Sequence, residues 1–106
     1  MAAYIYGNIE ITDPATYEEY RKVVELHVAA LNHAVAGIPP GRLRMHVCWG
    51  NYEGPHHRDL PFSEVIDIIL RARPGGLSFA AANPRHEHEW QIWESVRLPE
   101  GKVVIP

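Results

Sequence analysis

The sequence predicts a small α/β domain in which strands and helices alternate as β-α-β-α-β. Short segments in which apolar residues alternate with other residues indicate strands, and segments with apolar residues at steps of three and four indicate helices between them. A chain of 106 residues, of which 46% are hydrophobic and 22% charged, is long enough for one domain with one core. We therefore expect residues 1–106 to form a single domain, an open βαβαβ-type sheet with flanking helices.

The first strand and helix are predicted in the opening third of the chain. Residues 4–11, "YIYGNIEI", alternate with period two and predict a strand with one buried face. Asp13 and Pro14 then suit a helix start, and the helix should cover about residues 14–36. Gly37, in a left-handed cap, should end it together with the prolines that follow. The apolar stripe of this helix consists of Tyr17, Tyr20, Val24, His27, Val28, Leu31 and Val35.

A second strand is predicted at residues 42–49, "RLRMHVCW". Alternation puts Leu43, Met45, Val47 and Trp49 on one face and Arg44, His46 and Cys48 on the other. The connection that follows, "GNYEGPHHRDLP", is too long and too rich in Gly, Pro and His to be a simple turn. Loops of this length within a compact domain are usually functional or mobile.

The remaining elements complete the predicted sheet. A helix over about residues 62–73 is followed by a buried strand at residues 77–82, "LSFAAA", which makes a parallel, right-handed βαβ unit with the second strand. A short helix near Glu87–Glu94 and a last strand at Val103–Ile105 come next, with Gly101 at a turn.

Composition excludes several classes of partner. A net charge of −3 offers no attraction to nucleic acid or to an anionic membrane. No apolar run approaches the roughly 20 residues that a membrane span needs, and the N-terminus does not resemble a secretory signal. One cysteine cannot form an internal disulfide. These features predict a cytoplasmic protein.

His46 and Cys48 form the first candidate site. Residues i and i+2 of a strand point to the same side, so an imidazole nitrogen and a thiolate could converge on one cation. Zinc prefers such a mixture of nitrogen and sulfur donors. The alternative is that Cys48 packs as a small hydrophobic residue and His46 is a hydrogen-bonded core histidine.

Further polar residues follow two of the predicted strands. They are candidates for substrate binding because parallel α/β folds bind ligands at the carboxyl ends of their strands. The alternative is that they are solvated loop residues. These candidates are His56, His57, Asn83, Arg85, His86 and His88.

The strings "HVCWGNYEGPHH" and "ANPRHEHEW" resemble those of the cobalamin-independent methionine synthase-like family, in its methyltransferase and coenzyme M alkyltransferase-like branch. The resemblance covers about residues 24–106. It implies a segment of a (β/α)8 barrel in which a zinc ion binds a substrate thiol, lowers its pKa and promotes its attack on a methyl or alkyl donor. It also implies that His46 and Cys48 are two zinc ligands.

This chain departs from the family pattern at other ligand positions. The family has a glutamate in a segment like "SFEAANPRHEHEW", where this chain reads "SFAAANPRHEHEW" and has Ala80. A fourth ligand of the family, a cysteine, belongs to a later strand, beyond Pro106. A complete barrel needs roughly 200 residues or more. We therefore expect the isolated chain to be inactive, with no catalytic residues of its own.

The beginning of the chain resembles a different family. Residues 2–24 are similar to the opening strand and helix of a small uncharacterised family of dimeric α+β barrel proteins, whose members begin much like "AAYxIxxIEVTDPExYEEYRK". The chain is thus predicted to be a hybrid, with a foreign strand and helix over residues 1–24 and a methionine synthase-like barrel segment over residues 25–106.

Two functions follow from these patterns. The first is that of a zinc-dependent methyl or alkyltransferase segment that acts on a small thiol. The second is that of a non-catalytic α/β scaffold, or a small-ligand or metal-binding domain, that forms homodimers. In such a dimer, His46 and Cys48 from two chains could complete one His₂Cys₂ zinc site.

Overall fold

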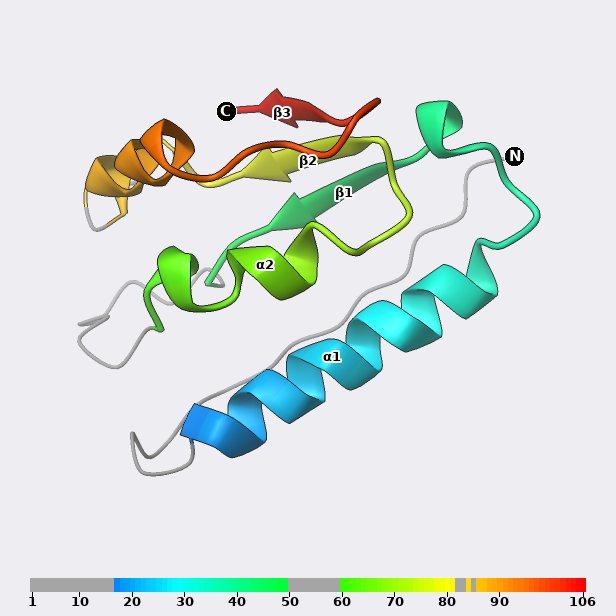
Figure 1. The fold of residues 1–106 in the computed structure, drawn as a ribbon, viewed down its shortest axis with the longest axis horizontal. Helices are drawn as coiled ribbons and strands as arrows, with labels where there is room; N and C mark the ends of the chain where they lie inside the picture. The colour runs from blue at the N-terminus through cyan, green and yellow to red at the C-terminus, as the bar shows by residue number, and fades with distance from the viewer. Residues whose placement is uncertain (1–16, 50–59, 82–83, 85) are drawn as a thin grey trace.

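Three short parallel strands and a set of helical segments make up the described part of the chain (Figure 1). The computed structural model describes residues 17–49, 60–81, 84 and 86–106. The predicted strand at residues 4–11 lies outside them. In chain order the elements are α1 (Tyr17–Ala34), the 3-10 turn η2 (Pro40–Arg42), β1 (Arg44–Val47), the 3-10 turn η3 (Phe62–Glu64), α2 (Ile66–Ile69), β2 (Gly76–Phe79), the 3-10 helix η4 (Glu87–Glu94) and β3 (Val103–Ile105).

The sheet has the order β1-β2-β3, and both pairs of strands are parallel. Met45 is opposite Leu77, and Leu77 is opposite Val104. These three side chains point to the same face and pack against the hydrophobic core. The predicted α/β class and the parallel pairing of β1 with β2 are confirmed, and β3 continues the same pattern.

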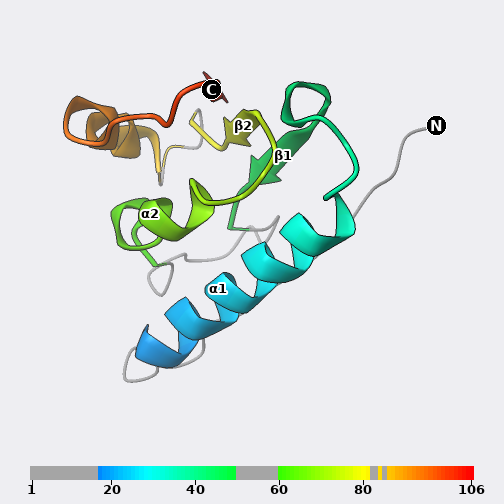
Figure 2. The ribbon, with the colours of Figure 1, turned by 45° about the vertical axis from the view of Figure 1, so that its right-hand side comes forward.

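The core lies between the sheet and the helices. Both views place α1 and α2 on the same side of the strands (Figures 1 and 2). Phe62 and Ile68 are the most deeply buried large side chains, at 0% and 1% exposure. In the described part of the chain the opposite face of the sheet is open, because Val103 is 60% exposed and Ile105 is 37% exposed.

Helix α1 follows most of its predicted stripe. Val24 and Val35 are buried, but His27 is exposed because it lies to one side of the row formed by residues 24, 28, 31 and 35. The predicted left-handed conformation of Gly37 is wrong, since Gly101 (φ 82°) has the only positive φ among the described residues. The helix instead ends in tight turns, in which the Ile38 N–H donates to the Val35 carbonyl at 2.9 Å.

The predicted continuous helix over residues 62–73 is also wrong. The segment forms η3 and then a single turn, α2, with Val65 between them at φ −128° and ψ −7°. The backbone N–H of Arg73 donates to Asn32 Oδ1 at 2.6 Å, and the Asn32 side chain donates to the Arg71 carbonyl at 3.0 Å. In a longer helix, these backbone groups would bond within the helix. Here the Asn32 side chain of α1 supplies their hydrogen-bond partners instead.

Polar contacts also join the two helices at their other end. The Arg21 guanidinium donates to Asp67 with Nη2 and Oδ2 3.0 Å apart, and it contacts the Glu64 carbonyl as well. The hydrogen bond from Arg21 lowers the pKa of the Asp67 carboxyl, because a positive partner favours the ionised form. Within the described residues, no helix is long and apolar enough to cross a membrane.

Candidate metal site

His46 and Cys48 lie on the exposed face of the β1 segment. Along β1, exposed residues alternate with half-buried ones, and Met45 and Val47 point toward the core. His46 and Cys48 are both exposed, as the alternation predicts. The alternative that both are buried packing residues does not agree with this exposure.

Ser78 holds the imidazole of His46. The two residues are opposite one another in the β1–β2 register, and His46 Nδ1 lies 3.2 Å from Ser78 Oγ. Metal-binding histidines usually make such a contact through one ring nitrogen, which orients the other nitrogen toward the metal. Ser78 would therefore orient the ring with Nε2 as the coordinating atom. The sequence patterns did not indicate Ser78, although the predicted pairing of the two strands offered a route to it.

Ala80 occupies the position at which a third ligand would be expected. The last paired residues of β1 and β2 are Val47 and Phe79, and Cys48 and Ala80 each come one residue later. Alternation along the chain places Ala80 on the same side as Ser78. A methyl group cannot coordinate a metal. Accordingly, no cluster of three or more His, Cys, Asp or Glu residues that could hold a metal occurs in the part of the chain that is described.

The donors that are present suit zinc but form only half of a tetrahedral set. An imidazole nitrogen and a thiolate are typical zinc ligands, and structural zinc sites have four. A metal ion at His46 and Cys48 would need two further ligands from water, a small thiol or a second chain. The pair can therefore form a half-site.

The other predicted site residues do not gather around this pair within the described structure. His86 is buried at 6% exposure and stacks on Trp49, with ring centroids 3.8 Å apart and an interplanar angle of 9°. It lies on the helix-covered side of the sheet, because Trp49 continues the inward row of Met45 and Val47. His88 is exposed in η4. The remaining candidates, His56, His57, Asn83 and Arg85, lie outside the described residues.

Glu89 is a buried polar residue that the sequence patterns did not indicate. Its Oε2 accepts a hydrogen bond from the Phe62 N–H at 2.6 Å, and its Oε1 contacts His86 Nδ1. The spacing of three residues between His86 and Glu89 is compatible with such a contact on a helical segment. The local pattern, however, does not indicate that Glu89, the last residue of the string "HEHE" (residues 86–89), is buried.

No protein-family model, no curated protein and no solved structure matches this chain. Its function must therefore be inferred from its own residues and their arrangement.

Proposed function

We propose that this chain is a segment of a zinc-dependent thiol methyl or alkyltransferase barrel, similar to the cobalamin-independent methionine synthase family. Its own activity is to bind zinc through His46 and Cys48, without catalysing group transfer alone. The observation that carries this proposal is the exposure of both side chains on one sheet face, with Ser78 beside the imidazole.

The sheet topology supports a barrel segment. Strands that are consecutive in sequence are neighbours in the sheet, and all are parallel. The helices α1 and α2 lie on one side of the strands (Figure 2). A (β/α)8 barrel combines these features, whereas a doubly wound sheet carries helices on both faces. His46 and Cys48 point to the face that α1 and α2 do not cover, which would correspond to the interior of such a barrel.

The position along the strand supports a ligand site. Cys48 follows the last residue of β1, Val47, so the pair lies at the carboxyl end of the strand. Enzymes with parallel α/β barrels bind substrates at this end. A zinc ion held there would supply the positive charge that lowers the pKa of a bound thiol.

Loading with cobalt(II), a spectroscopic substitute for zinc, tests the proposed ligands. The wild-type chain should show a sulfur-to-cobalt charge-transfer band, which Cys48→Ser removes and His46→Ala weakens. His33→Ala is the matched control, because His33 is an exposed histidine in the last turn of α1 and should have no effect. Absence of the band in the wild-type chain, or a cobalt affinity that neither variant changes, would show that the metal binds elsewhere.

The third-ligand position provides a gain-of-function test. Ala80→Glu adds a carboxylate on the same face as Ser78, so zinc affinity should increase by about tenfold, which corresponds to about 1.4 kcal/mol. Competition with a chromophoric chelator measures this affinity. Weaker zinc binding in Ala80→Glu would contradict the proposed placement of the ligands.

A second candidate function is that of a homodimeric scaffold with a shared metal site. The exposed apolar side chains of Val103 and Ile105 favour it, since they lie on the same open face as His46. Two such faces would bring together two imidazoles and two thiolates, the full set of a tetrahedral zinc site.

A further inference from the structure

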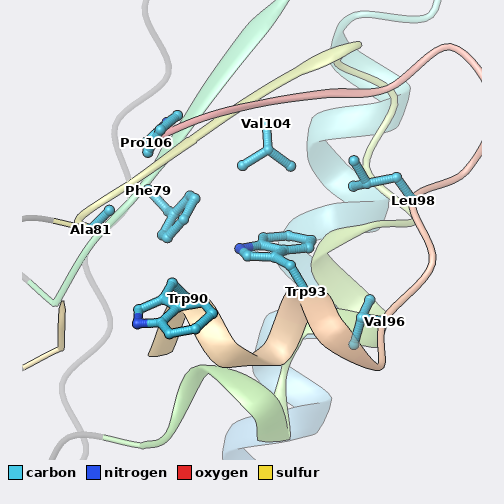
Figure 3. Close-up of a pocket in the computed structure, with 8 residues that line it drawn as sticks. All are labelled: Phe79, Ala81, Trp90, Trp93, Val96, Leu98, Val104 and Pro106. Carbon is cyan, nitrogen blue, oxygen red and sulfur yellow. The ribbon is translucent and has the colours of Figure 1, made fainter. Parts of the chain in front are cut away.

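Two cavities on the described surface differ in chemical character. One is apolar, and Figure 3 shows the aromatic side chains of Phe79, Trp90 and Trp93 along its walls. The other has a volume of about 410 Å³ and lies between the end of α1, η2 and the turn that leads from α2 into β2. We call it the arginine cavity, and its lining residues are Asn32, Ala36, Pro40, Arg71 and Arg73.

The arginine cavity lies at the amino end of the sheet. Arg73 precedes β2, which begins at Gly76, whereas Cys48 follows the last residue of β1. Because the strands are parallel, these two positions are at opposite ends of the sheet. In Figure 1 the strand arrows point away from the end that carries η2. The cavity is therefore separate from the pair formed by His46 and Cys48.

The Arg73 side chain is fixed at the wall of this cavity. Its backbone N–H donates to Asn32 Oδ1 at 2.6 Å, and its Nε–H donates to the Ile38 carbonyl at 3.1 Å. A guanidinium has five N–H donors, so those on the two Nη atoms take no part in these bonds. Within the described residues, Arg73 forms no ion pair. It thus presents an oriented positive charge.

Arg71 supplies a second guanidinium, which is held loosely. Its Nη1 is 3.8 Å from Glu25 Oε1, and its Nη2 is 3.6 Å from Asp67 Oδ2. Both distances exceed those of hydrogen bonds, and such exposed pairs contribute little to stability. Asp67 also accepts a closer bond from Arg21, at 3.0 Å. Arg71 can therefore turn toward an anion at small cost.

Two guanidinium groups in one cavity favour a phosphate group. Their like charges repel one another, and an anion between them relieves this repulsion. One arginine can occupy both oxygens of a carboxylate, whereas a phosphate group has three acceptor oxygens and nearly two negative charges. The cavity volume falls within the range of small-molecule sites, and Ala36 and Pro40 add apolar surface for an organic group.

We propose that the arginine cavity binds the phosphate group of a small soluble phosphate monoester. Arg71 and Arg73 donate hydrogen bonds to the phosphate oxygens, and the organic part lies against Ala36 and Pro40. This site does not depend on the proposed zinc site.

NMR spectroscopy of the full chain, freed of metal with a chelator, tests the site with inorganic phosphate and phenyl phosphate. Removal of metal ensures that zinc at His46 and Cys48 cannot hold the phosphate. Both probes should cause saturable shifts at the Arg73 Nε–H and at the Ala36 amide. Phenyl phosphate should bind at least as tightly as inorganic phosphate, because the cavity has room for its ring. Sodium chloride at the same ionic strength should not reproduce these shifts.

Charge-removing variants test the two arginines. Arg73→Gln should weaken phosphate binding about tenfold, as expected for the loss of a hydrogen bond to a charged group. Arg73→Lys keeps the charge without the fork of donors, so it should restore only part of the affinity. Arg71→Gln should also weaken binding. The Arg71 side chain is 60% exposed, so this variant keeps the test valid if the Arg73 variants fail to fold.

Arg97→Gln is the matched control, because Arg97 is an exposed arginine after η4 and the variant loses the same charge. It should leave phosphate binding unchanged. Absence of saturable shifts, equal shifts with sodium chloride, or shifts centred away from the lining residues would overturn the proposal. Equal weakening in Arg97→Gln and Arg73→Gln would overturn it as well. Binding to phosphatidate vesicles without binding to phenyl phosphate would assign the phosphate to a lipid and also overturn it.

Discussion

At the scale of single residues, the contact of His86 with Glu89 shows how a polar pair is held in an apolar core. Both residues are buried, at 6% and 7% exposure. Glu89 accepts a hydrogen bond from the Phe62 N–H, and His86 stacks on Trp49. One carboxylate thus connects η4 to η3 and, through the imidazole, to Trp49, two residues after the end of β1.

Removal of the Glu89 carboxylate should therefore destabilise the fold. Glu89→Ala leaves the buried Phe62 N–H without its acceptor, which should lower the free energy of unfolding by about 1–3 kcal/mol. Glu89→Gln keeps an acceptor oxygen and should cost less. Urea denaturation followed by tryptophan fluorescence measures both changes.

Glu87→Ala is the control for this comparison, because Glu87 begins the same helix but is exposed. It should change the free energy of unfolding by no more than about 0.5 kcal/mol. Equal losses in Glu87→Ala and Glu89→Ala would contradict the role assigned to the buried carboxylate.

At the scale of elements, Gly75 joins the start of the sheet to the turn before β1. Its N–H donates to the Pro40 carbonyl at 2.9 Å, and its carbonyl accepts from the Val103 N–H at 2.8 Å. A Cβ added at Gly75 would lie 2.8 Å from the Pro40 oxygen, which is closer than ordinary contacts allow. The close approach of η2, β2 and β3 therefore requires a glycine.

Gly75→Ala should weaken the contacts between η2, β2 and β3. The clash with the Pro40 backbone should cost about 1–3 kcal/mol, in the range of overpacking substitutions. Amide hydrogen exchange should show faster exchange at the Val103 N–H, which bonds to Gly75.

Gly37→Ala is the matched control for the glycine. Nothing lies within 4 Å of a Cβ added at Gly37, and its φ is not in the left-handed region. Its stability should be unchanged or slightly higher, because alanine restricts the unfolded chain. A loss at Gly37 as large as that at Gly75 would show that backbone freedom, rather than close packing, matters at both positions.

At the scale of the whole molecule, the open face of the sheet determines how metal binding and self-association are linked. The face presents His46 and the exposed apolar side chains of Val103 and Ile105. Burial of these apolar groups against a second copy would favour association, at about 25 cal/mol per Å² of apolar surface.

Native mass spectrometry with and without zinc should therefore show dimers that contain one zinc ion, and zinc should raise the dimer fraction. Cys48→Ser should lower it again, because each chain would lose one ligand. Ala80→Glu should increase the species with one zinc per chain while leaving a shared site largely unaffected. If each wild-type monomer bound one zinc ion, the shared site would be contradicted. The zinc ion would then be bound by His46 and Cys48 of one chain alone.

The sequence alone determined the features that depend on local periodicity. Alternation located β1 and assigned His46 and Cys48 to the face opposite Met45 and Val47. Side-chain direction in a strand follows from position along the chain, so distant residues are not needed to predict it.

Only the tertiary structure decided which groups satisfy one another. Asn32 hydrogen-bonds to the backbone after α2, and Ser78 contacts the imidazole of His46. Glu89 is buried, whereas Glu87 is exposed. These outcomes depend on contacts between residues far apart in the chain, which local patterns do not encode. The Trp93 Nε1–H, which has no hydrogen-bond partner among the described residues, is of the same kind, because such an absence is recognised only once the neighbouring elements are in place.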